Sequence, residues 1–358
     1  MIGRCLINAL NAALATASIL LLIWTGAFTA ASARERTCLR GVNIAGAEFG
    51  GYEGPYGESY IYPTDATLAW AASRKTTVIR LPFRWERLQP ELYAALDPAE
   101  LALLKQTVAK AKQHNLTTIL DPHNFAEYRD VKIGQGSVTV EAFADFWRKL
   151  GPEFSGDPRV LYLLMNEPEG VTATTWFKAA QAAILAIRGV GADNLVLIPG
   201  TIWTGASHWF DDLPGGSNAD VFKGIADPAN NFAFDIHQYL DADFSGRNAT
   251  CPRTADALKA LQAVTIWMRQ SGFQAHLGEF GGTASPDCLN GLAKVAAYIN
   301  GESDVWIGWT AWAAGDWWGD YALSLQPQGS IDTPQMTALK PFLTTSDGSP
   351  AVCGAAPN

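Results

Sequence analysis

The chain has 358 residues, of which 48% are hydrophobic and 17% are charged, a composition that suits one large globular domain or two ordinary ones. Its formal net charge of −9 at pH 7 argues against nucleic acid as a partner, because nucleic-acid-binding surfaces are basic. A neutral polymer suits such a surface better as a substrate.

The first 33 residues are predicted to be a secretory signal peptide. Arg4 is their only charged residue, an apolar stretch follows, and Ala31-Ser32-Ala33 is a small-x-small cleavage site. The uncharged stretch is also long enough to span a bilayer, so an uncleaved anchor, and with it a membrane association, is the alternative. We expect a mature catalytic domain at residues 34–358 that is secreted to the extracellular space or the periplasm.

Eight apolar segments with the composition of β-strands follow along the chain, at residues 39–45, 77–83, 117–122, 160–165, 195–199, 232–239, 275–280 and 306–312. Helical patterns alternate with them, at residues 64–74, 97–114, 140–153, 174–188, 218–226, 254–271, 287–299 and 333–343. The pattern at 218–226 is the weakest. Eight strand–helix repeats predict an α/β fold, a (β/α)8 TIM barrel forming a single catalytic domain.

An open, doubly wound sheet is the alternative fold. No strand is followed by a GxGxxG or GxxxxGK[ST] loop, which removes the usual nucleotide-binding forms of that fold. No Pro/Ser/Thr-rich linker or change of composition marks a second domain.

Four cysteines remain once the signal peptide, with Cys5, is removed, and an even number in an exported protein predicts two disulfides. Cys38 precedes the first strand and Cys353 follows the last helix, so both lie at the bottom of the predicted barrel. Cys251 and Cys288 each precede a helix that follows the sixth or seventh strand, so both lie at the top. This topology predicts the pairs Cys38–Cys353 and Cys251–Cys288.

Two glutamates end apolar strand segments, and they carry the strongest functional signal. Glu167 follows the segment at 160–165, and Glu279 ends the run that begins at Ala275. Burying a carboxylate is costly, so acids at the ends of core strands seldom serve stability. The carboxyl ends of parallel barrel strands face the active site, where two carboxylates can cleave a glycosidic bond.

Further polar and aromatic residues fall at the same ends of other predicted strands. Taken singly, each has a structural explanation: a satisfied core histidine, a packed aromatic ring or half of an ion pair. Their convergence on one mouth of the barrel favours a site instead. The residues are Arg80, His123, Asn124, Asn166, His237, Tyr239 and Trp312.

These segments resemble glycoside hydrolase family 5, and the resemblance covers essentially the whole mature chain. It is carried by Gly41-Val-Asn-Ile-Ala-Gly46, Leu120-Asp-Pro-His-Asn124, Asn166-Glu167-Pro168, Glu279-Phe280-Gly281 and Trp312-Ala-Ala-Gly315. They are most similar to the subfamily that contains fungal and bacterial endo-β-1,4-glucanases. The resemblance implies a shared set of eight residues, which here are Arg80, His123, Asn166, Glu167, His237, Tyr239, Glu279 and Trp312.

Roles follow from the resemblance and from the chemistry of the residues. Glu279 is expected to be the nucleophile and Glu167 the acid/base of a retaining double displacement. Arg80 and Tyr239 suit keeping Glu279 ionised. Arg80 and Tyr239 are also expected to belong to the substrate-binding set, together with the remaining shared residues and Asn124. Trp203, in a predicted top-face loop, offers an aromatic face for a sugar ring.

The sequence therefore predicts a secreted, retaining endo-β-1,4-glucanase, a monomer that acts on β-glucan polysaccharide or oligosaccharide and needs no metal or organic cofactor. The same machinery directed at β-mannan or mixed-linkage glucan, or used for transglycosylation, is the nearest alternative. A non-catalytic carbohydrate-binding barrel is the alternative from another class, and the presence of both glutamates argues against it.

Overall fold

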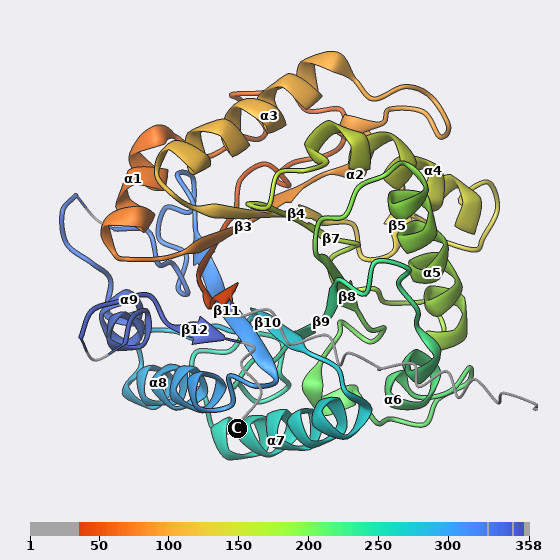
Figure 1. Ribbon diagram of the computed structural model, residues 1–358. Coiled ribbons are helices and arrows are strands. Elements are labelled where there is room, and N and C mark those ends of the chain that lie inside the picture. The colour runs from red at the N-terminus through yellow and green to blue at the C-terminus, as the bar shows by residue number, and fades with distance from the viewer. Residues whose placement is uncertain (1–35, 328, 346, 354–358) are drawn as a thin grey trace, which may run out of the picture. The chain divides into compact units, whose positions relative to one another are not determined.

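The computed structural model describes residues 36–327, 329–345 and 347–353 (Figure 1). The predicted signal peptide, residues 1–33, lies outside the described residues, so its cleavage stays a prediction. Within the described ranges, no helix combines the length and the apolar character needed to cross a lipid bilayer.

Eight parallel strands close into a barrel in the order β10-β11-β2-β3-β4-β7-β8-β9 (Figure 1). The predicted TIM barrel is therefore confirmed. The strands are β2 (Leu39–Ile44), β3 (Val78–Phe83), β4 (Thr117–Pro122), β7 (Val160–Leu163), β8 (Val196–Pro199), β9 (Phe232–His237), β10 (Ala275–Glu279) and β11 (Trp306–Ala314).

Helices surround the strands (Figure 1). The α-helices are α1 (Asp65–Ser73), α2 (Trp85–Leu88), α3 (Pro98–Gln113), α4 (Val140–Leu150), α5 (Ala173–Gly189), α6 (Asn218–Val221), α7 (Thr254–Ser271), α8 (Pro286–Gly301) and α9 (Pro334–Leu339). Short 3-10 turns lie at Gly151–Phe154, Ala206–His208, Phe222–Gly224 and Lys340–Phe342. Two small antiparallel pairs complete the fold, β1 (Arg36–Thr37) with β12 (Val352–Cys353) and β5 (Glu127–Tyr128) with β6 (Val131–Lys132).

Side-chain capping explains where several helices begin. Thr64 precedes α1 and its hydroxyl accepts from the backbone N–H of Thr67, while Asp97 precedes α3 and accepts from the first-turn amides. The helix predicted at 218–226 begins at Asn218 as expected, but only α6 (Asn218–Val221) is α-helical: a 3-10 turn over Phe222–Gly224 follows directly, and Ile225 is extended. Gly215 and Gly216 precede α6 with φ of 98° and 87°, so the chain there forms a turn rather than an additional helical turn.

The barrel interior changes from apolar to polar along its axis. Side chains alternate along a strand, so Val78 and Arg80 of β3 both point inward, as do Ala233 and Asp235 of β9. The lower interior holds a buried apolar cluster that includes Val78 and Ala233. The residues nearer the carboxyl ends of the strands are charged or polar and form the floor of the site described below.

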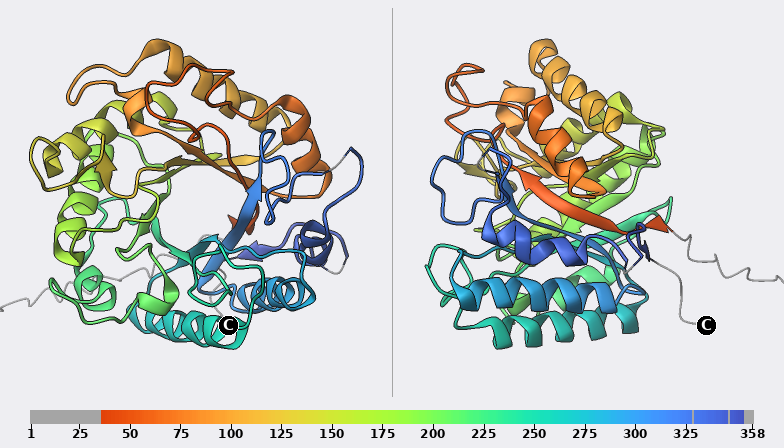
Figure 2. Two further views of the ribbon diagram at one scale, coloured as in Figure 1. Left: turned by 180° about the vertical axis from the view of Figure 1, so that it is seen from behind. Right: turned by 90° about the vertical axis from the view of Figure 1, so that its left-hand side faces the viewer.

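The loops that follow the strands extend together at one end of the barrel, as the side view in Figure 2 shows for those after β2 and β11, whereas β1 lies at the other end. The two disulfides join Cys38 to Cys353 and Cys251 to Cys288, which are the predicted pairs. The first lies beside the β1–β12 pair. The second joins Cys251, in the loop after β9, to Cys288 in the first turn of α8, and the loop between β10 and α8 begins next to Glu279.

The two disulfides are expected to contribute differently to stability and activity. Their sequence separations are 315 and 37 residues, so chain entropy assigns roughly 6 kcal/mol to Cys38–Cys353 and roughly 4 kcal/mol to Cys251–Cys288. We predict that replacing the first pair by alanine lowers the free energy of unfolding more. Replacing the second pair is expected to cost more activity, because it releases loops beside the site. Denaturant unfolding and initial rates on the β-glucan that the sequence predicts as substrate measure the two effects, and equal activity losses would contradict the second part.

Candidate active site

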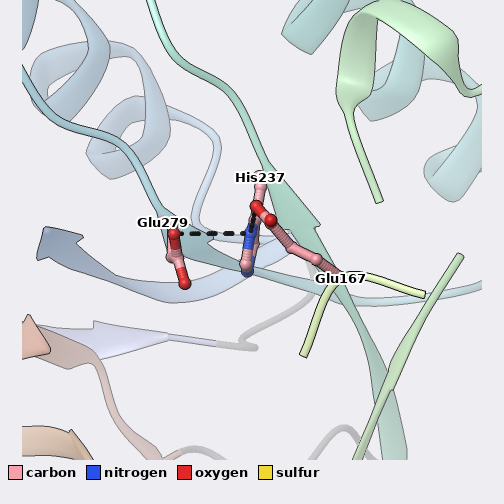
Figure 3. Close-up of side chains that lie close together, drawn as sticks. All are labelled: Glu167, His237 and Glu279. Atoms are coloured by element: carbon pink, nitrogen blue, oxygen red, sulfur yellow. Dashed lines mark hydrogen bonds and ion pairs between the residues drawn. The ribbon is translucent and has the colours of Figure 1, made fainter. Parts of the chain in front are cut away.

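Two carboxylates meet at the centre of the polar end of the barrel. Glu279 is the last residue of β10, and Glu167 lies in the loop that follows β7. One carboxylate oxygen of each and one ring nitrogen of His237 all lie within 4.8 Å of one another (Figure 3). Glu279 is buried, with 4% of its surface exposed, whereas the side chain of Glu167 is 16% exposed. The less buried carboxyl group is the one with easier access to solvent.

His237 links the two glutamates from below. Its Nδ1 donates to Oε1 of Glu167 at 2.7 Å and lies 3.7 Å from Oε2 of Glu279 (Figure 3). Burial by itself lowers the pKa of His237, but the charges of Glu279, Asp235 and Glu167 outweigh burial and raise the pKa to about 10. The ring is therefore an imidazolium at neutral pH, with a proton on each nitrogen.

Glu279 receives a hydrogen bond on each oxygen. Nη1 of Arg80 donates to Oε1 at 2.9 Å, and the hydroxyl of Tyr239 donates to Oε2 at 2.8 Å. Burial raises the pKa of Glu279, while the positive charges of His237 and Arg80 act in the opposite direction. Both donors bind the charged carboxylate, so they stabilise the form that a nucleophile needs.

Arg80 is fully buried and organises several residues around it. Nη1 lies 3.0 Å from Oδ2 of Asp121 and donates to Oδ1 of Asn43 at 2.8 Å, and Nη2 donates to Oδ1 of Asn166 at 2.5 Å. Burial favours loss of the proton, but the neighbouring carboxylates of Asp121 and Glu279 raise the pKa of Arg80. The guanidinium is thus a fixed cation beneath the site.

His123 continues the network toward the cleft wall. Its Nδ1 donates to Oδ2 of Asp121 at 2.7 Å, and its Nε2 accepts from Nδ2 of Asn166 at 3.1 Å. Because Arg80 holds the oxygen of the Asn166 amide, the orientation of that amide is determined on both sides. The His123 ring stacks on Trp312, with centroids 5.6 Å apart and an interplanar angle of 24°.

A cleft of about 820 Å³ opens above these residues. Loops after β8 and β9 form much of its wall. Trp203, on the loop after β8, is 50% exposed as a residue and lines this cleft. The predicted site residues that line the cleft are His123, Glu167, Trp203, His237, Tyr239, Glu279 and Trp312.

Three predicted substrate-binding residues are not among those that line the cleft. Arg80 and Asn166 are 0% and 1% exposed and lie directly beneath it. Asn124 differs from the prediction more strongly: it is fully buried, its Oδ1 accepts from the backbone N–H of Trp85 at 2.8 Å, and its Nδ2 donates to Oε2 of Glu86 at 2.6 Å. Its side chain therefore orders the loop behind the cleft instead of facing a substrate.

Sequence reasoning passed over two buried residues of the network, Asp235 and His276. Asp235 lies two residues before His237 on β9, and His276 lies on the neighbouring strand β10. Strand alternation was the signal that would have revealed Asp235, because residues two apart face the same side. Both residues are at most 1% exposed.

Glu167, His237 and Glu279 together have the spacing of a metal site. A histidine ligates a metal through a deprotonated nitrogen. Here Nδ1 and Nε2 of His237 both hold protons and face carboxylates. The geometry therefore suits hydrogen bonding and proton transfer better than metal binding.

Comparison with known proteins identifies the family. The sequence model described as cellulase (glycosyl hydrolase family 5) matches residues 40–315. The chain belongs to glycosyl hydrolase family 5. As a member of that family it is a glycoside hydrolase, and the predicted family resemblance is confirmed.

Individual relatives agree with the family assignment. This chain is 34% identical over 311 residues to endo-beta-1,4-glucanase A of Emericella nidulans. The match covers 86% of this chain and 92% of that protein. The structure of XacCel5A in complex with cellopentaose is similar, with 43% identity, a TM-score of 0.84 and coverage of 86% of this chain and 99% of that one. Endoglucanase Cel5A of Pseudomonas stutzeri in complex with cellobiose has 34% identity, a TM-score of 0.78 and coverage of 89% and 96%.

The protonated His237 is expected to make the stability of this hydrolase depend on alkaline pH. Its pKa rises from 6.5 to about 10 on folding, so its contribution is complete below about pH 6.5 and is lost as the pH approaches 10. We predict that the free energy of unfolding falls across this window, by an amount on the order of a few kcal/mol. Urea unfolding at a series of pH values measures it. His237→Gln should be less stable at neutral pH and should show a weaker fall; an unchanged fall would contradict the assignment.

Proposed function

We propose that the protein is a secreted, retaining endo-β-1,4-glucanase that hydrolyses internal bonds of cellulose-type β-glucan through residues 34–358. The observation that carries this proposal is the pair Glu167 and Glu279, with oxygens within 4.8 Å of each other in an open cleft. Retaining glycosidases hold their carboxyl groups about 5–5.5 Å apart, whereas inverting enzymes need roughly 6.5–9.5 Å to admit a water. The names of the relatives and the cellopentaose complex of XacCel5A support the choice of substrate.

In the first step, a carboxylate oxygen of Glu279 attacks the anomeric carbon of the sugar. The bond between that carbon and the glycosidic oxygen breaks, and Glu167 donates its proton to the leaving oxygen. Arg80 and Tyr239 hold Glu279 in one orientation, which reduces the reorganisation needed before attack. A covalent glycosyl-enzyme results.

In the second step, Glu167 acts as a base. It takes a proton from water, the resulting oxygen attacks the anomeric carbon, and Glu279 leaves as a carboxylate. The partial exposure of Glu167 suits this step, because water must reach it after the leaving group departs. Two inversions at one carbon retain its configuration.

The remaining residues of the cleft are suited to hold the sugar. One N–H of the Asn166 amide binds His123, and an amide nitrogen carries two, so the second suits the sugar 2-hydroxyl beside Glu279. Trp312 and Trp203 offer aromatic faces to the apolar faces of glucose rings. Secretion agrees with the signal-like N-terminus and with two disulfides, which persist in oxidising compartments.

The catalytic roles predict different responses to different leaving groups. Glu279→Ala is expected to abolish turnover of every substrate, since no covalent intermediate forms. Glu167→Ala should slow cellulose hydrolysis by at least about a hundredfold but slow an activated aryl cellobioside far less in the first step, because a good leaving group needs little protonation. Burst and steady-state kinetics separate the two steps. Comparable first-step losses on both substrates for Glu167→Ala would exclude it as the acid.

The substrate assignment predicts a preference between two polymers. Glucose carries its 2-hydroxyl equatorially and mannose axially, so mannan would misplace the contact with Asn166 where transition-state charge develops. We expect kcat/KM on β-1,4-glucan to exceed that on β-1,4-mannan by at least about tenfold, or roughly 1.4 kcal/mol. Reducing-sugar assays on cellulose, mannan and mixed-linkage glucan measure it. Equal or faster hydrolysis of mannan would refute the assignment of β-1,4-glucan as the preferred substrate but would leave the retaining mechanism standing.

A further inference from the structure

Asp235 lies at the base of the site, where the mechanism just described gives it no role. It is 1% exposed, and its two oxygens accept from two different imidazoles: Oδ2 from Nε2 of His237 at 3.1 Å and Oδ1 from Nδ1 of His276 at 3.0 Å. A carboxylate only accepts hydrogen bonds, so each of these nitrogens carries a proton. Burial opposes ionisation of Asp235, but the two imidazoles lower its pKa, so it stays charged.

The neighbouring strand leaves Asp235 little freedom to move. Gly278 of β10 packs against its carboxylate, and a Cβ atom at that position would lie 2.5 Å from both oxygens. The glycine thus permits the close approach, and the carboxylate in turn determines the orientation of the His237 ring. This arrangement resembles the way in which a carboxylate orients a catalytic imidazole through its second nitrogen.

The charges around His237 come from several strands. Glu167, Glu279 and Asp235 are its acidic neighbours, and Arg80 and His276 lie on the far side of Asp235 and Glu279. His276 has a lowered pKa because it is buried, so it stays neutral and does not replace the charge of His237.

We propose that Asp235 is a positioning residue of the hydrolytic reaction: it keeps His237 doubly protonated and turned so that its Nδ1–H faces the two catalytic carboxylates. This inference rests on the proposed function. Its consequence concerns the acid proton. With both nitrogens protonated, Nδ1 donates to Oε1 of Glu167 and leaves the other oxygen free to carry the proton that the leaving group receives. A neutral ring with its proton on Nε2 would instead accept that proton at Nδ1 and withhold it from the substrate.

The variant that tests this role is Asp235→Asn. Asparagine has nearly the same shape but only one acceptor oxygen and no charge, so it binds one imidazole N–H instead of two. We expect the His237 ring to lose a proton between about pH 5 and pH 8, a range in which the parent protein keeps both. We therefore expect kcat/KM on cello-oligosaccharides to fall by less than about threefold near pH 5 but by at least about tenfold near pH 8.

Two measurements separate positioning from a merely structural role. Nitrogen-15 NMR of the imidazoles reports ring protonation directly, and the chain has five histidines, so individual His→Gln variants assign the signals. Asp227→Asn is the matched control. The side chain of Asp227 is as buried as that of Asp235 and is paired with Arg188, but it lies before β9, at the end of that strand away from the cleft. The Asp227→Asn variant should be less stable than the parent protein but should keep the same pH profile of kcat/KM.

Three results would overturn the proposal. One is a single proton on the His237 ring of the parent protein near pH 7, which needs no variant to fold. Another is a doubly protonated His237 ring that persists in Asp235→Asn up to about pH 9. The third is an activity loss in Asp235→Asn that is the same at every pH. If the parent protein cleaves no β-1,4-glucan, the proposed function fails, whereas the NMR titration still reports whether Asp235 controls His237.

Discussion

The buried positive charge of Arg80 is the constraint on which the site depends. Removing one partner of a buried ion pair costs about 3–5 kcal/mol, so the guanidinium must be surrounded by acceptors. Asp121 and Glu279 supply the opposite charges, and Asn43 and Asn166 supply further oxygens. The same contacts that neutralise the cation also hold Glu279, the proposed nucleophile, and the amide proposed to bind sugar. Stability and preorganisation of the site therefore have one cause.

The two glutamates sit on supports of different rigidity. Glu279 belongs to a barrel strand and is held by two donors. Glu167 itself has a φ of 39° and lies in a loop. Nζ of Lys132, on the β5–β6 hairpin, donates to Oε1 of Glu169 in the same loop at 2.6 Å. A rigid nucleophile and a more accessible acid/base agree with their proposed roles, since only the second must exchange protons with the leaving group and with water.

A second buried cation, His237, complements Arg80 on the other side of Glu279. The two cations differ in kind, because a guanidinium stays charged at all accessible pH values whereas an imidazolium depends on its neighbours. The carboxylates of Asp235, Glu167 and Glu279 raise the pKa of His237 and so keep it charged. The site is therefore a connected set of charges in which removing one charge shifts the pKa values of the neighbouring titratable groups.

The amino-acid sequence by itself determined the eight strand–helix repeats, the two glutamates at strand ends and both disulfide pairs. These follow from local patterns, since hydrophobic period and capping residues act over a few positions, and the barrel topology then sorts residues to its two ends.

Only the tertiary structure decided the distance between the carboxylates, because barrel closure brings together β7 and β10, which are not adjacent strands. It also decided the fate of Asn124: β4 ends at Pro122, the backbone N–H of Asn124 donates to the Pro122 carbonyl, and the turn directs the side chain toward Trp85 and Glu86 instead of the cleft. The loop after β8 carries two tryptophans with different surroundings: Trp203 is exposed, whereas Trp209 is buried against Phe234 and Trp267. Packing of the whole loop, and not residue type, therefore selects which aromatic ring faces the cleft.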